Sequence, residues 1–287
     1  VETGCILAMG GVLGMIAPPV NIPAMIIGAG IDIPYVGFEL PLALMTFPLA
    51  FLFVLMFGLK HVRRMDYEVV RLKISDEVRR KYGFRIYLPL IVAVVLMVLN
   101  KAVPAVPDIG MPLVFLISAF VGLFTGKKVK ALTTARDAIG SVLPVLGILM
   151  GVGMFIQVMT LTGVRGLIVT SCLSLPDWMR YVALSISVPA FGAVSAFGSA
   201  SVLGVPFLLS MLGQSQIITC AGISLISGLG DMVPPTALAG MFAAQVIKLD
   251  RYSQILKKCL IPCLIIIVWG LLFILFSNQL APYIILK

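Results

Sequence analysis

VETGCILAMGGVLGMIAPPVNIPAM at residues 1–25 and IITCAGISLISGLGDMVPPTALAGM at residues 217–241 are two copies of one pattern. Aligned without a gap, they are identical at Thr3/Thr219, Leu13/Leu229, Gly14/Gly230, Pro18/Pro234, Pro19/Pro235 and Met25/Met241. Each copy carries a double proline in the middle of an apolar run. A proline lacks a backbone N–H and crowds the carbonyl four residues earlier, so it ends or kinks a helix. The pattern therefore predicts two helices that are interrupted at matching positions.

The composition indicates a chain that lies in lipid. It is 60% hydrophobic and 11% charged, and its mean hydropathy is +1.13. A water-soluble core of 287 residues does not need so much apolar surface. The net charge of +9 gathers in a few loops, which is typical of membrane topology and argues against nucleic-acid binding. The five cysteines show no metal-ligand spacing and are expected to be small buried hydrophobes.

The predicted fold class is all-α: a polytopic membrane protein with inverted repeats, discontinuous helices and a re-entrant hairpin. We expect residues 1–59 to end a first repeat, 60–85 to form a basic cytoplasmic linker, and 86–287 to form a second repeat. Full spans are expected at 39–59, 86–100, 109–126, 139–161 and 259–276, an interfacial segment at 164–177, a hairpin at 178–213 and a broken helix at 217–247. Because the chain starts inside an apolar segment, we also expect an N-terminal part to be missing.

Charge predicts the orientation. The loops at 60–85, 127–137 and 248–258 hold 17 of the 21 Lys and Arg residues, so the positive-inside rule places them in the cytoplasm. If 178–213 is a hairpin that returns to the outside, the first broken helix runs outward and the second runs inward. The two repeats are then inverted, and breaks at matching places in such repeats point to a transporter's binding site.

The chemistry of the breaks defines the candidate site. The double prolines leave the carbonyls of Gly14 and Met15, and of Gly230 and Asp231, without helical partners, and such oxygens suit Na⁺. Beyond each break a half-helix begins with free N–H groups that favour a carboxylate. The candidate Na⁺ ligands are Gly14, Met15, Asn21, Ser199, Gly230, Asp231 and Thr236. The candidate substrate contacts are Pro19, Val20, Asn21, Gly198, Ser199, Ala200, Ser201, Pro235 and Thr236.

Two alternatives to this reading remain open. The prolines could kink the helices while Ser and Thr side chains satisfy the freed carbonyls. Asp231, the only acid predicted deep in the membrane, could bind a cation, carry a proton or cap the break. His61 falls in the basic loop and is expected to be solvated. Since the chain shows neither a nucleophile–base pair nor a metal cluster at membrane depth, we expect no enzyme activity.

The motifs resemble those of a known family. GVLGMIAPPVNIPAMIIG and SGLGDMVPPTALAGMF are similar to the two Gly-x-x-(Ile/Thr)-Pro-Pro segments of the large membrane subunit of TRAP (tripartite ATP-independent periplasmic) transporters. GSASVLGVPFLL resembles the hairpin-tip motif of the wider ion-transporter superfamily. The resemblance covers essentially the whole chain, with two departures. Val20 replaces the usual Ser of the first motif and Val233 replaces the usual Thr of the second.

The resemblance implies an elevator-type carrier in the bacterial inner membrane, crossing it several times. It would take up organic acids such as C4-dicarboxylates with Na⁺ as coupling ion and no other cofactor. A periplasmic substrate-binding protein and a small membrane subunit would be its partners. The main alternative is a stand-alone divalent-anion:cation symporter of the same superfamily, and a non-transporting scaffold is a further alternative that would not need the inverted breaks.

Overall fold

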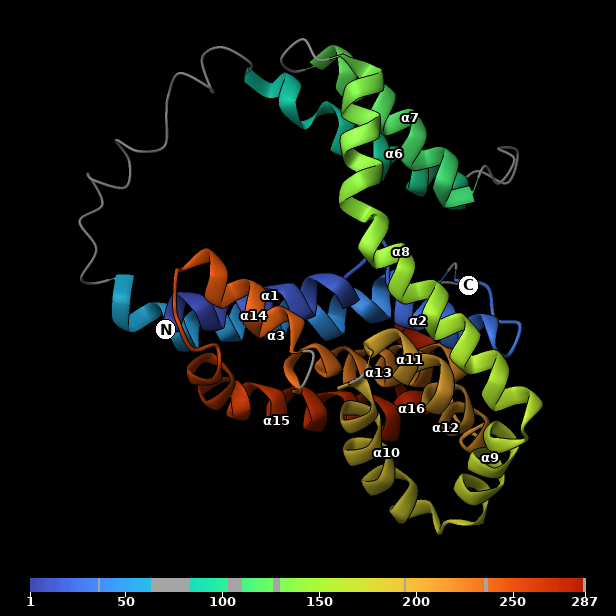
Figure 1. Ribbon diagram of the computed structural model, residues 1–287. Coiled ribbons are helices and arrows are strands. Elements are labelled where there is room, and N and C mark those ends of the chain that lie inside the picture. The colour runs from blue at the N-terminus through green and yellow to red at the C-terminus, as the bar shows by residue number, and fades with distance from the viewer. Residues whose placement is uncertain are drawn as a thin grey trace. The chain divides into compact units, whose positions relative to one another are not determined.

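The computed structural model describes residues 1–35, 37–62, 83–102, 110–125, 130–193, 195–234 and 237–285. Within these ranges the regular elements are all helical and no strand is present, which confirms the all-helical class (Figure 1). The chain divides into two compact units, Val1–Arg63 with Ile148–Lys287, and Arg64–Gly147. The predicted basic linker at 60–85 falls mainly outside the described residues.

The unit Arg64–Gly147 contains a short helical hairpin. Its described elements are η1 (Gly83–Tyr87), α6 (Leu88–Ala102), α7 (Gly110–Thr125) and the first part of α8 (Ala131–Leu161). Helices α6 and α7 pack together, and a Cβ on Gly122 would lie 3.6 Å from the Pro89 ring. The predicted apolar spans at 86–100 and 109–126 therefore coincide with two helices that pair along their length.

The other unit holds both copies of the repeated pattern. Its first elements are α1 (Glu2–Ile16), α2 (Ile22–Ala29), α3 (Glu39–Val62), the remainder of α8 and α9 (Val164–Ser174). The hairpin region contains α10 (Asp177–Gly192), α11 (Ala196–Ser199), the π-helical turn η2 (Ala200–Gly204) and α12 (Val205–Ser210). The second copy forms α13 (Gln216–Gly228), the 3₁₀ turn η3 (Leu229–Met232) and α14 (Leu238–Val246), and α15 (Ser253–Leu275) and α16 (Ser277–Ile284) follow.

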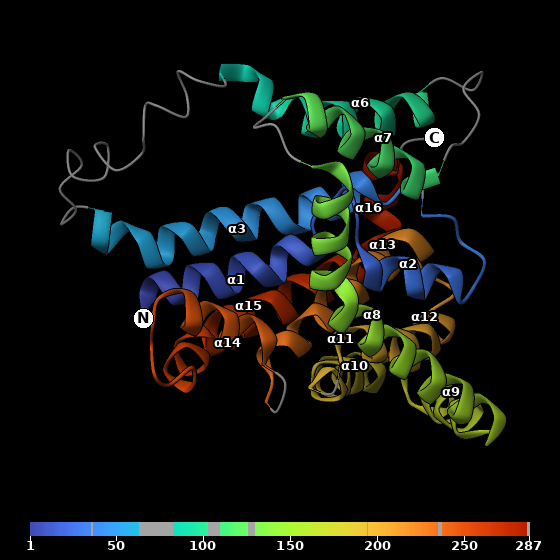
Figure 2. The same ribbon diagram turned by 45° about the horizontal axis from the view of Figure 1, so that its top comes forward.

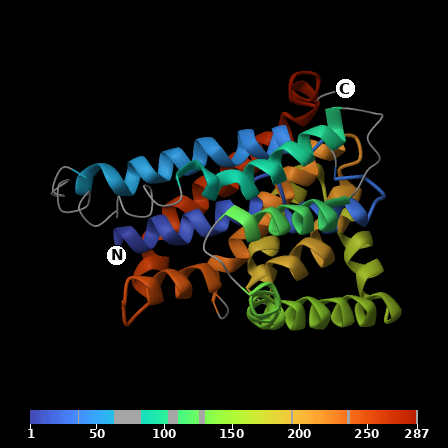
Figure 3. The ribbon, with the colours of Figure 1, turned by 90° about the horizontal axis from the view of Figure 1, so that it is seen from above.

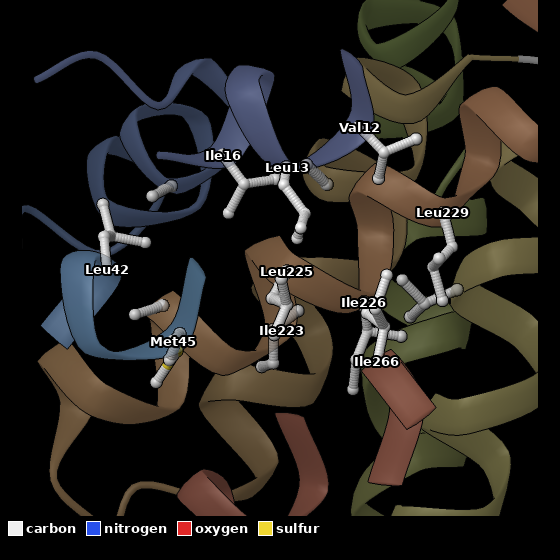
Figure 4. Close-up of a cluster of buried hydrophobic side chains, with 14 of the residues drawn as sticks. Val12, Leu13, Ile16, Leu42, Met45, Ile223, Leu225, Ile226, Leu229 and Ile266 are labelled. Atoms are coloured by element: carbon white, nitrogen blue, oxygen red, sulfur yellow. The ribbon is translucent and has the colours of Figure 1, made fainter. Parts of the chain in front are cut away.

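Helix α13 is the centre of this unit. Every residue from Ile218 to Gly228 is buried, as expected for a helix that is covered on all sides. Helices α1 and α15 pack against it, and α3 lies beside α1 (Figures 2 and 3). Figure 4 shows the resulting core, where side chains of α1, α3, α13, η3 and α15 meet. The labelled members are Val12, Leu13, Ile16, Leu42, Met45, Ile223, Leu225, Ile226, Leu229 and Ile266.

Glycines allow α13 and α15 to approach closely. A Cβ on Gly222 would lie 3.1 Å from the carbonyl oxygen of Gly270, and one on Gly270 would lie 3.3 Å from that of Gly222. The two backbones therefore touch at this crossing, which is a common packing mode of helices in membranes.

Two helices of the described chain are long and apolar enough to cross a bilayer. They are Glu39–Leu59 within α3 and Ser253–Leu275, with mean hydropathies of 2.4 and 2.6. Only 33% and 28% of these windows are buried, so most of their apolar surface faces outward. Phe51 is 66% exposed and Ile261 is 65% exposed. Exposed apolar faces of this kind favour contact with lipid.

Two helices begin earlier than the sequence-based ranges, and one further helix was not expected. Helix α8 begins at Ala131 rather than near 139, and α15 begins at Ser253 rather than near 259. In both cases the helical backbone continues through polar residues that hydropathy places in a loop. Helix α16 was not expected, because its eight residues are too few and too polar to be recognised as a span.

Candidate functional site: two helix breaks and a hairpin tip

The two copies of the pattern are interrupted at the same aligned positions. In the first copy the helix ends at Ile16 and a new helix begins at Ile22. In the second copy the helical backbone ends at Met232 and resumes at Leu238. Ile16 aligns with Met232, and Ile22 with Leu238. The helix therefore stops and restarts at equivalent positions in the two copies, and residues 17–21 of the first copy are not helical.

The two broken helices lie antiparallel. Helix α1 packs against α14, and α2 packs against α13 (Figure 1). Four contacts mark the register: Gly11 with Ala239, Ile16 with Gly228, Asn21 with Ser224, and Ala24 with Cys220. As the residue number rises in the first copy, that of its partner falls in the second. This is the pairing that two repeats of opposite direction would make.

The carboxyl ends of α1 and α13 meet at the breaks. A Cβ on Gly228 would lie 2.9 Å from the Ile16 side chain and 3.4 Å from that of Met15. Each helix end carries the negative end of its dipole. Two such ends side by side favour a cation between them.

Asn21 is the polar side chain of the first break, and it makes three hydrogen bonds. It is fully buried, and its Oδ1 accepts the Ala24 N–H at 2.8 Å, which caps the start of α2. Its Nδ2 donates to the Ile16 carbonyl and to Ser224 Oγ, both at 3.0 Å. One amide thus ties the end of α1, the start of α2 and the middle of α13.

The remaining residues of the first break lie near the surface of the unit. Gly14 and Pro19 are exposed, whereas Met15 and Val20 are half-buried. Pro18 and Pro19 offer no N–H to the carbonyls of Gly14 and Met15, and no turn or side-chain hydrogen bond of the described residues ends on either oxygen. Within the described residues these two carbonyls therefore have no such partner.

The second break is partly satisfied by its own backbone. The Gly230 carbonyl accepts the Val233 N–H at 3.0 Å, so the expectation that Pro234 leaves this oxygen without a partner is wrong. The physical reason is the 3₁₀ turn, which replaces the missing i+4 donor with an i+3 donor. Asp231 is half-buried, and its carboxylate has no ion pair within the described residues. Pro235 and Thr236 lie outside the described residues.

Helix α14 begins differently from α2. Its N-cap is Ala237, which aligns with Asn21, and no side chain of the described residues caps the helix. Ala237 is fully buried and has a left-handed backbone with φ of 34°. Within the described residues, the N–H groups in the first turn of α14 therefore have no side-chain acceptor. In the first turn of α2, by contrast, Asn21 accepts the N–H of Ala24.

The hairpin tip packs against both broken helices. Ser195 Oγ accepts the Gly198 N–H at 3.2 Å and so caps α11. Ser199 Oγ donates to the Val188 carbonyl across the two arms. The tip then turns through η2, where Gly204 fits against Ile27 of α2. The predicted tip residues are all buried: Gly198, Ser199, Ala200 and Ser201.

Three polar residues of α13 were missed by the sequence reading. Cys220 Sγ donates to the Ala24 carbonyl at 3.6 Å, Ser224 accepts from Asn21, and Ser227 Oγ lies 3.5 Å from the Ala196 carbonyl. Their spacing of four and three residues puts them on one face of the helix. That spacing inside an apolar segment was the available signal, but it does not say which segment this face contacts.

Comparisons with known protein families, with curated proteins and with solved structures find no match for this chain.

Proposed function

We propose that this chain belongs to a secondary carrier of the bacterial inner membrane that takes up small organic acids together with Na⁺, as the large permease subunit of a TRAP-type system. The observation that carries the proposal is the antiparallel pairing of the two broken helices. In this pairing the carboxyl ends of their first halves, α1 and α13, meet. Two matched interruptions beside the most buried helix are not required in a soluble helical bundle. A carrier, by contrast, needs polar backbone at membrane depth to bind its substrate.

The cation side of the proposal rests on oxygen atoms. The open carbonyls of Gly14 and Met15 end α1, and the end of α13 at Gly228 adds its dipole beside them. Asp231 is the acidic residue of the second copy. A small hard cation such as Na⁺ takes oxygen ligands of this kind and offsets the cost of leaving them unpaired in an apolar surrounding.

The anion side rests on the start of α14. Its first turn carries no side-chain cap in the described chain, and it begins directly after the second break. Free N–H groups and the positive end of the helix dipole favour a carboxylate. A cation at the first break and a carboxylate at the second would partly neutralise each other, which gives coupling between the two a simple electrostatic basis.

Two contacts between helices support the proposed topology. Lys258 of α15 pairs with Glu2 of α1, so both helices start at the same end of the unit. At the other end, Asn278 Nδ2 donates to the Gly213 carbonyl at the base of the hairpin. With the basic loop at 248–258 in the cytoplasm, the hairpin base lies on the outer side. The hairpin then enters and leaves from the outside, as the charge pattern predicts.

Transport assays test the proposal. Vesicles from cells that express the full protein should accumulate labelled C4-dicarboxylate when an inward Na⁺ gradient is imposed. Uptake driven equally well by a proton gradient in Na⁺-free buffer would contradict Na⁺ coupling.

A stand-alone anion:cation symporter is the second candidate, and the loss of hydroxyl groups at Val20 and Val233 favours it. It would transport without added binding protein. A tripartite system would require both a periplasmic binding protein and a small membrane subunit.

A further inference from the structure

The side chain of Asn21 is committed to hydrogen bonds with the protein. Both hydrogens of Nδ2 have acceptors, the Ile16 carbonyl and Ser224 Oγ, and Oδ1 faces the Ala24 N–H. The orientation of the amide follows from these partners, because a backbone N–H requires an oxygen opposite it. Ser224 is equally constrained, since its Oγ donates to the Ala221 carbonyl at 2.7 Å and accepts from Asn21. Both residues are fully buried.

We propose that Asn21 and Ser224 form a positioning pair for the cation site, acting through the backbone rather than as ligands of the ion. The inference rests on the proposed function and refines it. Asn21 holds the last carbonyl of α1, and Ser224 fixes Asn21 to α13 one turn before that helix ends. The pair therefore sets how the open carbonyls of Gly14 and Met15 face the end of α13.

The physical argument depends on where the two copies are joined. Residues 21 and 224 are separated by 203 positions in the sequence. Among the described residues, their hydrogen bond is the one between side chains that joins the first break to the second copy. Cys220 Sγ adds a longer bond to the Ala24 carbonyl at 3.6 Å, whereas Ile16 and Met15 meet Gly228 through apolar contacts that tolerate sliding. A hydrogen bond as short as that between Asn21 and Ser224 fixes register to within a fraction of an ångström. Groups that orient ligands in this way typically contribute roughly 10- to 100-fold to the affinity of a metal site.

The test uses Na⁺ alone on the purified full-length protein. The melting temperature is recorded across a NaCl series, and choline chloride holds the ionic strength constant. An ion that binds the native state raises the melting temperature, so the series reports Na⁺ binding. Ser224→Ala should increase the Na⁺ concentration at half effect by roughly 10- to 100-fold. Ser224→Cys fills the same space with a weak acceptor and should act in the same direction, which covers failure of the alanine variant to fold.

Thr219→Val is the matched control. Thr219 lies on the same helix, is fully buried, and its Oγ1 has no hydrogen-bond partner within the described residues. Valine keeps its shape, so the half-effect concentration of Na⁺ should not change. A purely structural role of Ser224 would lower the melting temperature without Na⁺ but leave the half-effect concentration as it is, and that result would overturn the positioning pair.

Asn21→Asp separates a positioning residue from a ligand. Aspartate keeps the cap on Ala24 but cannot donate to the Ile16 carbonyl, so a positioning role predicts weaker Na⁺ binding. A direct ligand would bind Na⁺ as tightly or more tightly as a carboxylate, and such a gain would overturn the inference. A wild-type protein that shows no response to Na⁺ would overturn the proposed function and this inference with it, whereas a normal wild-type response with unchanged variants would overturn the pair alone.

Discussion

Gly192 and Gly230 bring the backbone of the hairpin arm α10 against η3, the turn that ends the first half of the second broken helix. A Cβ on Gly192 would lie 2.6 Å from the Gly230 Cα, and a Cβ on Gly230 would lie 2.6 Å from both the Cα and the carbonyl oxygen of Gly192. No side-chain rotation can relieve a contact between two backbones. These glycines therefore hold the hairpin against the second break, much as Asn21 holds the first break against α13.

Gly192→Ala should destabilise the protein by about 1–3 kcal/mol, the usual cost of overfilling a packed interior. Gly10→Ala is the control, because a Cβ on Gly10 meets nothing within 4 Å and alanine is the better helix former by about 1 kcal/mol. Denaturant or thermal unfolding of the two purified variants measures the difference. Equal stabilities would contradict the close backbone approach.

Single residues were predictable only where their chemistry is local. The double prolines and the amide that follows them identify the first break from sequence, because helix interruption depends on nearby residues. The partner of Asn21 could not be found in this way, since Ser224 becomes its neighbour only once the antiparallel register is known. For the same reason the bond between Val233 and Gly230 was missed, as it depends on whether the turn tightens to 3₁₀ geometry.

At the scale of elements, Arg180 joins the open ends of the hairpin. Its Nε donates to the Leu175 carbonyl at 3.0 Å and its Nη1 donates to the Ser210 carbonyl at 2.9 Å, which is the end of α12. Nη1 also lies 3.1 Å from a carboxylate oxygen of the exposed Asp177. Nearby, Gln214 Nε2 donates to Tyr181 Oη. The hairpin is therefore closed by polar contacts at its base and by buried small residues at its tip.

Arg180→Lys should loosen the hairpin although it keeps the charge. A lysine ammonium cannot reproduce the planar fork that reaches two separate carbonyls, and losing such bonds costs about 1–3 kcal/mol. Hydrogen exchange should accelerate in α12 and at the start of α10. Arg251→Lys, at an exposed position, serves as the control and should leave exchange unchanged. Unaltered protection of α12 in Arg180→Lys would contradict this role.

Helix identity was easier to predict than helix length. The apolar segments all correspond to helices in the described chain, because hydropathy reports burial in lipid or protein. Their ends depend on the backbone ladder, which continues into polar residues at the starts of α8 and α15. Neither hydropathy nor the backbone ladder of a long span predicts helix α16. Its eight residues are amphipathic, and Asn278 within it bonds to the neighbouring hairpin base.

At the scale of the unit that holds both copies, two polar contacts mark its opposite ends. Glu2 with Lys258 marks one end, and Asn278 with Gly213 marks the other. The exposed large residues on α3 and α15 lie between these ends along the two candidate spans. This arrangement fits a body that crosses a bilayer with its basic end in the cytoplasm.

Cysteine labelling tests the orientation. In a background with the native cysteines replaced, Lys257→Cys and Tyr283→Cys place one thiol at each end, and Tyr283 is 85% exposed. A membrane-impermeant maleimide added to intact cells should label position 283 and leave position 257 unmodified until the membrane is opened. Labelling of both from the same side would refute the topology.

The central claim is that the two broken helices pair in antiparallel register, and a designed crosslink measures this most directly. A Cβ on Gly11 would lie 4.0 Å from Ala239 Cβ, within the range of about 3.5–4.5 Å that a disulfide requires. Gly11→Cys with Ala239→Cys, oxidised in native membranes with the other cysteines removed, should form an intramolecular disulfide detected after proteolysis. Gly10→Cys with Ala239→Cys should not, because position 10 lies about 100° around the helix from position 11 and nothing lies within 4 Å of a Cβ at Gly10. Absence of the first crosslink, or equal formation of both, would contradict the account.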